Sequence, residues 1–368
     1  MKCKIIWNYS IGWTLAFLFL VIIRGVGATE DGDLKFDTTT GLLVSLPVGL
    51  LFGAISGYAQ ILTEQHFYNK TPLGKLLVGR ILFALLFMSA LILLNYAVYT
   101  LIGGNSISLA AFAFNGYGSL VMYFYWVCVD LFMALLRQVS LMLGEGNLTK
   151  LLRGKFYYPT EEERIFMFLD LQSSTHLAEK LGHVQYSFLL QDCFDDLGVV
   201  DQNRAQVYQY VGDEVILTWN LRDGLNHQYC LRAYYNFKTR LESRKQYYQQ
   251  RYGCFPFFKA GLHSGKVIVT EIGKLKKEIA YHGDTLNTAA RIQEKCNDFQ
   301  QELLISDHLR RQLNGSRAFD YNPKGPIRLK GKQTHTQVYA VLPHADPGEE
   351  LELTVKQHSK TVDQFIQC

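Results

Sequence analysis

The sequence lacks paired cysteines and any strong excess of charge of one sign. Its seven cysteines are an odd number, and no two stand at CxxC spacing. A disulfide framework and a zinc site are therefore not indicated, and a reduced, cytoplasmic environment suits the water-soluble part of the chain best. The net charge of +4 is mild and the basic residues are mixed with acidic ones, so nucleic acid is not an expected partner.

The sequence also lacks internal repeats and low-complexity tracts, and a length of 368 residues suggests two or three domains. Apolar residues are concentrated in roughly the first 140 positions, whereas the remainder has the mixed composition of a soluble domain. This asymmetry predicts a membrane-embedded part followed by a water-soluble part.

Four apolar stretches are each long enough to cross a bilayer, which takes about 20 residues. They run over residues 5–23, 42–62, 76–99 and 119–136. Gly49, Gly53 and Gly57 lie four residues apart in the second stretch and predict a face for close packing against another helix. We therefore expect an all-α membrane bundle of about four spans over residues 1–137.

The charges flanking these stretches predict their orientation. The first loop is acidic and the third loop carries no charge. Basic residues precede the first stretch, surround the second loop and follow the fourth stretch: Lys2, Lys4, Lys70, Lys75, Arg80, Arg137, Lys150, Arg153 and Lys155. The positive-inside rule then places both termini in the cytoplasm, in a multi-pass protein of the inner or plasma membrane.

Two features of this part have alternative interpretations. Lys2, Lys4 and the small residues 25–28 also resemble a cleaved secretory signal, which would leave three spans. Asp130 lies inside the fourth stretch, where an ionisable residue is either functional or a carboxylate that faces the bundle interior and bonds to Tyr or Trp neighbours. We favour the interior carboxylate.

The second part of the chain begins with a predicted connector over 138–160 and ends with a tail over 344–368. Between them, over 161–343, periodicity predicts strands at 165–169, 206–211, 214–219, 257–263, 266–272 and 338–342, and helices at 174–198, 228–251 and 284–296. The order β-α-β-β-α-β is that of a ferredoxin-like α+β domain, here with additions.

Two acidic residues stand at informative positions in this domain. Asp170 ends the first strand, and Asp213 lies in the turn of the central hairpin. These strands are neighbours in a ferredoxin-like sheet, so the two carboxylates can converge and suit Mg²⁺ with a polyphosphate. A helix that starts near Ser174 would present free N–H groups to the phosphates, although an Asp before a helix is by itself usually a cap.

Two further elements carry polar residues. Asn287 and Arg291 are four apart on one helical face, where the amide could orient a ribose and the guanidinium could stabilise phosphoryl charge. Lys330 lies in a Leu-Lys-Gly-Lys segment and can reach a triphosphate. Taken alone, Asn287 and Arg291 are better explained as a solvent-facing amide and an extended arginine, and a solvated turn explains Lys330 equally well.

Five blocks in this order resemble the catalytic domain of class III adenylyl/guanylyl cyclases. They are residues 168–171 (FLDL), 210–214 (YVGDE), 261–265 (GLHSG), 283–291 (GDTLNTAAR) and 329–332 (LKGK). The resemblance covers residues 163–342, and the membrane part is similar, more weakly, to those of bacterial membrane cyclases.

The resemblance implies a homodimer with active sites in its cleft, each holding two Mg²⁺ or Mn²⁺ ions. The metal-site residues of one subunit would be Asp170, Leu171 and Asp213, and Asn287, Arg291 and Lys330 would come from the other. Ser173, Ser174 and Thr175 would lie at the phosphates. The ribose 3′-OH of a nucleoside triphosphate would attack the α-phosphorus in line, giving the 3′,5′-cyclic monophosphate and pyrophosphate.

The chain departs from the family pattern at the two base-reading positions. Gln209 and Ala280 stand where adenylyl cyclases have a Lys and an Asp, and the pair expected of guanylyl cyclases is absent as well. ATP is the default substrate, with GTP or a pyrimidine triphosphate as alternatives. We interpret His263 and His282 as structural, and Glu214 as a non-catalytic residue that points to the opposite face of its strand from Asp213.

Two other functions fit parts of the pattern. The missing base-reading pair would suit a nucleotide-binding sensor or scaffold without turnover, but the retained Asp170, Asp213, Asn287 and Arg291 argue for an enzyme. A diguanylate cyclase would carry a Gly-Gly-Asp/Glu-Glu-Phe turn, whereas this hairpin reads Val-Gly-Asp-Glu-Val.

Overall fold

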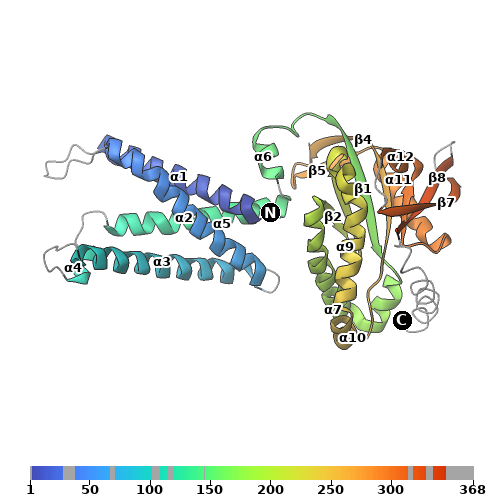
Figure 1. Ribbon diagram of the computed structural model, residues 1–368, viewed down its shortest axis with the longest axis horizontal. Coiled ribbons are helices and arrows are strands. Elements are labelled where there is room, and N and C mark those ends of the chain that lie inside the picture. Colours follow the sequence, from blue (N-terminus) through green and yellow to red (C-terminus); the bar gives the residue numbers. More distant parts are fainter. Residues whose placement is uncertain are drawn as a thin grey trace. The chain divides into compact units, whose positions relative to one another are not determined.

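The computed structural model describes residues 2–27, 38–66, 71–101, 108–114, 119–144, 146–313, 318–328 and 335–344. The chain divides into two compact units, Met1–Leu143 and Gly144–Cys368 (Figure 1). We call them the helical unit and the sheet unit and describe each by itself. Their all-α and α+β architectures confirm the predicted fold class.

The helical unit contains the four predicted apolar helices. They are α1 (Lys2–Gly27), α2 (Thr38–His66), α3 (Leu73–Leu101) and α5 (Ser119–Leu143), and a short unpredicted helix, α4 (Leu109–Phe114), lies between the last two. Each long helix is long and apolar enough to cross a membrane. Large apolar side chains such as Leu43, Leu86 and Phe124 are about 70% exposed, as expected of residues that face lipid.

Helices α1 and α2 pack closely through the predicted glycine face. A Cβ on Gly53 would lie 2.2 Å from the Cα of Ser10, and one on Gly49 would lie 2.5 Å from the Cα of Thr14. Only glycine permits backbones to approach so closely. The prediction of a close-packing face is confirmed, and its partner is α1.

A buried ion pair lies inside the helical unit. Arg80 of α3 donates to Oδ1 of Asp130 on α5 at 2.7 Å, and both side chains are about 95% buried. The interior placement of Asp130 is as we predicted, but its direct partners are Arg80 and Ser56 rather than Tyr or Trp. A charged partner compensates a buried carboxylate better than a neutral donor does. A second ion pair joins Glu64 of α2 to Arg137 of α5 at 2.8 Å.

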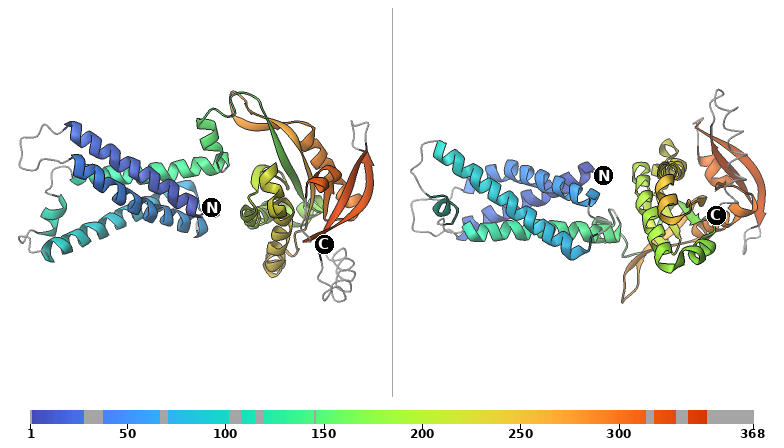
Figure 2. Two further views of the ribbon diagram at one scale, coloured as in Figure 1. Left: turned by 45° about the horizontal axis from the view of Figure 1, so that its top comes forward. Right: turned by 90° about the horizontal axis from the view of Figure 1, so that it is seen from below.

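The sheet unit is built on one eight-stranded sheet. Its strands are β1 (Thr160–Leu171), β2 (Gln206–Val211), β3 (Glu214–Asn220), β4 (Phe258–Ile272), β5 (Glu278–His282), β6 (Leu303–Ser306), β7 (Phe319–Arg328) and β8 (His335–Pro343). The order is β2-β3-β1-β4-β6-β8-β7, with β5 paired to β4. Figure 2 shows the sheet unit from two further directions. The four strands β2-β3-β1-β4 have the predicted ferredoxin-like arrangement.

The helices of the sheet unit are α6 (Asn147–Leu152), α7 (Ser174–Asp196), α8 (Leu221–Leu225), α9 (Tyr229–Ser243), α10 (Lys245–Tyr252), α11 (Asp284–Asp298) and α12 (Asp307–Gln312). Two short 3₁₀ helices, η1 (Leu197–Asn203) and η2 (Asn226–Gln228), complete them. The helix predicted over 228–251 is wrong in one respect: it is interrupted at Arg244, which bonds instead to Asp196 of α7.

The strand pair predicted over 257–263 and 266–272 is a single long strand, β4. Ser264 and Gly265 read as a turn, yet both pair with β1. Ser264 is buried and donates to Gln312, and a Cβ on Gly265 would lie 2.7 Å from Oγ1 of Thr285. Gly265 is therefore required for the close approach of α11, and the chain does not change direction there. Strands β5, β6 and β7 were not predicted.

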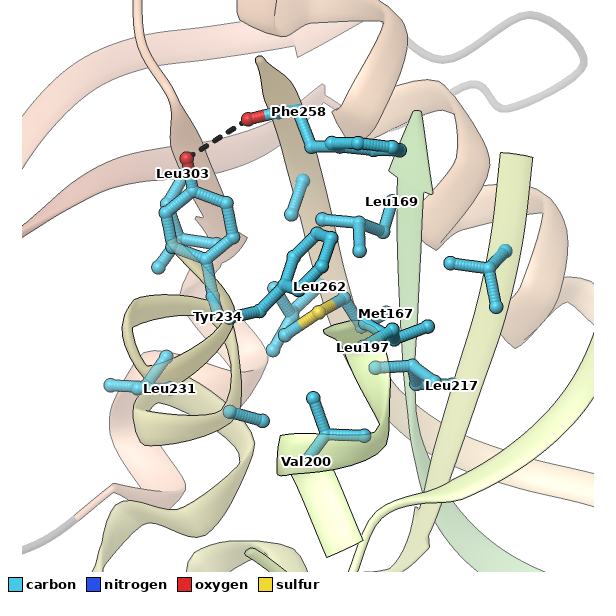
Figure 3. Close-up of a cluster of buried hydrophobic side chains, with 14 of the residues drawn as sticks. Met167, Leu169, Leu197, Val200, Leu217, Leu231, Tyr234, Phe258, Leu262 and Leu303 are labelled. Carbon is cyan, nitrogen blue, oxygen red and sulfur yellow. Dashed lines mark hydrogen bonds between the residues drawn. The ribbon is translucent and has the colours of Figure 1, made fainter. Parts of the chain in front are cut away.

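Alternation along β1 assigns its side chains to two cores. Ile165, Met167, Leu169 and Leu171 face α7 and α9, where they join Leu231, Tyr234, Phe258 and Leu262 (Figure 3). Phe166 and Phe168 face α11 and pack with Ala289. Asp170 continues this second series, so the fold directs its carboxylate to the same face as α11.

Candidate active site

The two predicted aspartates are held at neighbouring strand ends. Asp170 pairs with Glu214 in the antiparallel β1–β3 register, and Asp213 is the residue before Glu214. Gly212 has a φ of 64°, a left-handed conformation that lets the β2–β3 hairpin turn in two residues. The tight turn places Asp213 beside the end of β1, as the sequence predicted.

Three carboxylates gather at this point, and no cationic side chain among the described residues neutralises them. Burial and the nearby Asp213 raise the pKa of Asp170 to about 6. Burial, Asp170 and Asp213 raise the pKa of Glu214 to about 7. Among the described residues, Asp170 accepts a hydrogen bond from Gln293 at 3.3 Å, and none of the three carboxylates has an ion-pair partner. The arrangement favours a bound cation.

The position of Glu214 contradicts our prediction that this residue points to the opposite face of its strand from Asp213. Alternation along a strand separates neighbouring residues only while both remain in the strand, and Asp213 lies in the turn. Directly opposed residues in an antiparallel pair share a face, so Glu214 lies on the face of Asp170. Glu214 therefore belongs to the acidic cluster and not to the opposite side of the sheet.

The donor set suits a divalent metal with oxygen ligands. Asp170 and Asp213 supply carboxylates, and the side chain of Leu171 is buried in the apolar core, so only its backbone carbonyl is available as a ligand. In the described ranges no three His, Cys, Asp or Glu side chains form a complete ligand group. Two carboxylates and a carbonyl are oxygen donors of the kind that Mg²⁺ or Mn²⁺ takes, together with phosphate oxygens and water.

The segment after β1 leads directly into α7. Ser173 has a φ of 57°, and α7 begins at the next residue without a side-chain cap. The N–H groups of the first turn have no partner within the helix, and Ser173 and Thr175 are exposed. Burial and Asp213 raise the pKa of Tyr186, which lies in α7 beside Ser174, to about 12. The helix start thus lies beside the carboxylates.

Asn287 and Arg291 lie on α11, whose other face is buried. Ala289, Ile292 and Gln293 pack against the sheet, while Asn287 is exposed and Arg291 is half-buried. In the described part of the chain neither one bonds to Asp170 or Asp213 of the same subunit. Both remain available to a group outside their own domain.

Comparison with known proteins identifies the domain that carries these residues. The family model of the adenylate and guanylate cyclase catalytic domain matches residues 156–342. The chain belongs to this cyclase family.

Individual relatives agree with this assignment. Adenylate cyclase 2 of Rhizobium meliloti (strain 1021) is 34% identical over 196 residues, which are 53% of this chain and 54% of that protein. The chain thus spans about half the length of this curated relative. A solved bacterial light-regulated adenylyl cyclase is similar in fold, with a TM-score of 0.53 and 18% identity over 66% of this chain and 71% of that one.

The two positions that we predicted to read the base lie on strands that approach each other. Gln209 is exposed on β2 and Ala280 is buried on β5. Their chain neighbours Tyr208 and Tyr281 meet edge to face with ring centroids 4.9 Å apart. The two positions therefore flank one aromatic cluster, which also includes Phe166. Lys330 lies outside the described residues.

Two polar residues of the cyclase domain, Arg164 and Gln293, were not singled out from the sequence. Arg164 of β1 is fully buried, bonds to Thr218, Gln206 and Asn220, and lies 4.9 Å from the ring centroid of Tyr281. Gln293 contacts Asp170. The sequence provided no signal for either residue, because a single polar residue in a strand or helix does not indicate which groups its side chain contacts. His263, which we predicted to be structural, lies with its Nδ1 2.7 Å from Oγ of Ser306.

Proposed function

We propose that this protein is a membrane-bound nucleotidyl cyclase that converts a nucleoside triphosphate, by default ATP, into its 3′,5′-cyclic monophosphate and pyrophosphate. The observation that carries the proposal is the convergence of Asp170 and Asp213 at one end of a cyclase-family sheet, with no cation among the described residues to neutralise them. The reaction forms a bond between the ribose 3′ oxygen and the α-phosphorus and breaks the bond to the pyrophosphate oxygen.

Asp170, Asp213 and the Leu171 carbonyl would hold two Mg²⁺ or Mn²⁺ ions with the triphosphate. When bound, such ions stabilise charge on the phosphate oxygens and help ionise the 3′-hydroxyl. Glu214 adds negative charge beside them, and Gln293 orients Asp170 through its hydrogen bond. Ser173, Ser174 and Thr175 offer backbone and hydroxyl donors to the phosphates at the start of α7.

The site would be completed by a second copy of the chain. Among the described residues neither Asn287 nor Arg291 bonds to another side chain of its own domain, and a homodimer would bring the second subunit's pair to the triphosphate opposite Asp170. There the amide would orient the ribose and the guanidinium would stabilise developing phosphoryl charge. Lys330 of that second subunit would contact the phosphates.

The base is expected to be bound differently from that in adenylyl cyclases with Lys and Asp. Gln209 can donate to and accept from a base edge through its amide, whereas Ala280 offers only shape and backbone groups. Because of this departure, ATP is the default substrate, and GTP or a pyrimidine triphosphate are alternative substrates.

We further propose that the helical unit anchors the cyclase in the inner or plasma membrane. The four apolar helices support this, and the basic residues around the second loop and after α5 support a cytoplasmic cyclase domain. We propose that α1 is retained rather than cleaved, because it packs on the glycine face of α2.

The experiment is a turnover assay on the full-length chain in detergent or nanodiscs. ATP, GTP, CTP and UTP are supplied separately with Mg²⁺ or Mn²⁺, and both pyrophosphate and cyclic product are measured. We expect one nucleotide to give stoichiometric amounts of the two products, with no turnover in the Asp170→Ala variant. Nucleotide binding without product from any of the four would favour a non-catalytic sensor instead.

A further inference from the structure

The ion pair in the helical unit is part of a network that joins three helices. Ser56 of α2 donates to Oδ1 of Asp130 at 2.5 Å, and Arg80 of α3 donates to the same oxygen and to the Ser56 hydroxyl at 2.7 and 2.9 Å. The second carboxylate oxygen of Asp130, Oδ2, takes no part in this network. It is buried and has no partner among the described residues.

Two indole groups near Asp130 are unpartnered as well. Nε1 of Trp13 on α1 and Nε1 of Trp126 on α5 are buried donors without acceptors in the described part of the chain. Both rings pack against Phe52, with centroid separations of 5.7 and 5.2 Å. Buried polar groups in proteins are nearly always bonded, so these three, which lie in the same unit as the equally unpartnered Tyr9 Oη and Arg80 Nε, require an explanation.

The three residues that carry these groups all line one small, mainly apolar cavity. The cavity has a volume of about 20 Å³ and is lined by Trp13, Trp126 and Asp130 together with Phe52, Phe83 and Met88. A space of at least about 10–15 Å³ can hold one water molecule, provided that two to four polar partners surround it. The cavity is therefore large enough for one such molecule and too small for an organic ligand.

We propose that this cavity is a binding site for a single water molecule. The water accepts hydrogen bonds from the two indole N–H groups and donates one to Oδ2 of Asp130. Two donors and one acceptor match the valence of water, which typically makes about three bonds in protein interiors. A cation of the same size would leave both indole donors unbonded, and an apolar atom would leave all three groups unbonded.

The bound water has a specific structural consequence. The direct network of Ser56, Arg80 and Asp130 joins α2, α3 and α5 but not α1. The water connects Trp13 of α1 to Asp130, and so extends the network to all four long helices. In a low-dielectric environment such a closed network holds the helices in one register.

The test is a water–indole magnetisation-transfer NMR experiment on the full-length chain labelled with ¹⁵N-tryptophan. The chain has only four tryptophans, so its indole signals can be assigned by single Trp→Phe variants. We expect persistent cross-peaks to water for the indole protons of Trp13 and Trp126. Trp219 is an internal control for which we expect no cross-peak, since it is fully buried and its Nε1 donates to the Asn203 carbonyl at 2.9 Å.

A cavity-filling variant makes the test specific. Ala84 lines the cavity, so Ala84→Leu should expel the water and remove both cross-peaks. Ala90→Leu is the matched control, because Ala90 lies on the same helix and is exposed. Absence of both cross-peaks in the wild-type protein would overturn the proposal, and that result does not depend on how the variants fold. Cross-peaks that persist unchanged in a folded Ala84→Leu variant would also overturn it.

Discussion

Asp170 on β1 and Glu214 on β3 lie directly opposite each other in the sheet, with Asp213 adjoining. The fold thus brings three carboxylates together, and burial, followed by repulsion from the neighbouring carboxylates, raises the pKa values of Asp170 and Glu214 to about 6 and about 7. Such a cluster opposes folding when it is ionised, and a bound cation removes that opposition. Function and stability are therefore in conflict at this point of the sheet.

The first prediction concerns stability without metal. The pKa of Asp170 is higher in the folded protein than its ordinary value of 3.8, so stability is greatest below that value and falls as pH rises through about 6. Asp170→Asn should therefore stabilise the sheet unit at pH 8 in EDTA by about 1–2 kcal/mol, allowing for solvent screening. Calorimetry at pH 4 and pH 8 measures this, with the exposed Asp201→Asn as control. A less stable Asp170→Asn protein at pH 8 would contradict the prediction.

The second prediction concerns Glu214, which alternation alone would dismiss. Glu214→Gln removes one negative charge beside the metal-site aspartates but none of the proposed ligands. We expect Mn²⁺ affinity to fall by about 3–10-fold, equivalent to about 1 kcal/mol at an effective dielectric constant of about 20. Mn²⁺ binding can be followed by electron paramagnetic resonance, with Glu242→Gln on the exposed side of α9 as the matched control. An unchanged affinity would mean that Glu214 does not contribute to metal binding.

Much of the fold followed from periodicity and length. Long apolar stretches define the four helices, and the glycine turn before Asp213 defines the central hairpin. Strand β7 was not predicted, because Pro323 and Pro326 interrupt the sequence pattern of a strand. Proline removes a donor from the ladder, which an edge strand such as β7 tolerates.

The sequence predicted the candidate site only where the order of the strands in the sheet determines it. The convergence of Asp170 and Asp213 follows from strand order, but the position of Glu214 depends on the register between two strands. Likewise, Arg80 and Asp130 are 50 residues apart, and their pairing depends on the rotation of two helices about their axes. Sequence periodicity does not specify register or rotation between separate elements.

The third prediction concerns the choice of base. Restoring both family residues with Gln209→Lys and Ala280→Asp should raise the ratio of kcat/KM for ATP over GTP by about tenfold or more, because paired polar groups discriminate strongly between base edges. Each single variant should do less. Competition assays with both nucleotides measure the ratio. No change in the double variant, with activity retained, would show that other residues read the base.

The fourth prediction concerns the buried ion pair. Arg80→Met leaves Asp130 as an uncompensated buried charge, and Asp130→Leu does the same to Arg80. Each should destabilise the helical unit by about 3 kcal/mol, and the double variant should recover most of that loss. Thermal unfolding of the full-length protein in one detergent provides the comparison. Additive losses in the double variant would mean that the two residues do not depend on each other.

The most direct test of the proposed composite site is a mixing experiment with two inactive full-length variants. Asp170→Ala lacks a metal-site carboxylate, and Arg291→Ala lacks the group that the second subunit would lend. Each alone should be inactive, whereas co-expression should restore activity to about a quarter of wild type, because about half of the dimers are mixed and each has one intact site. If the mixture is as inactive as its components, both groups act within one subunit and the composite site is wrong.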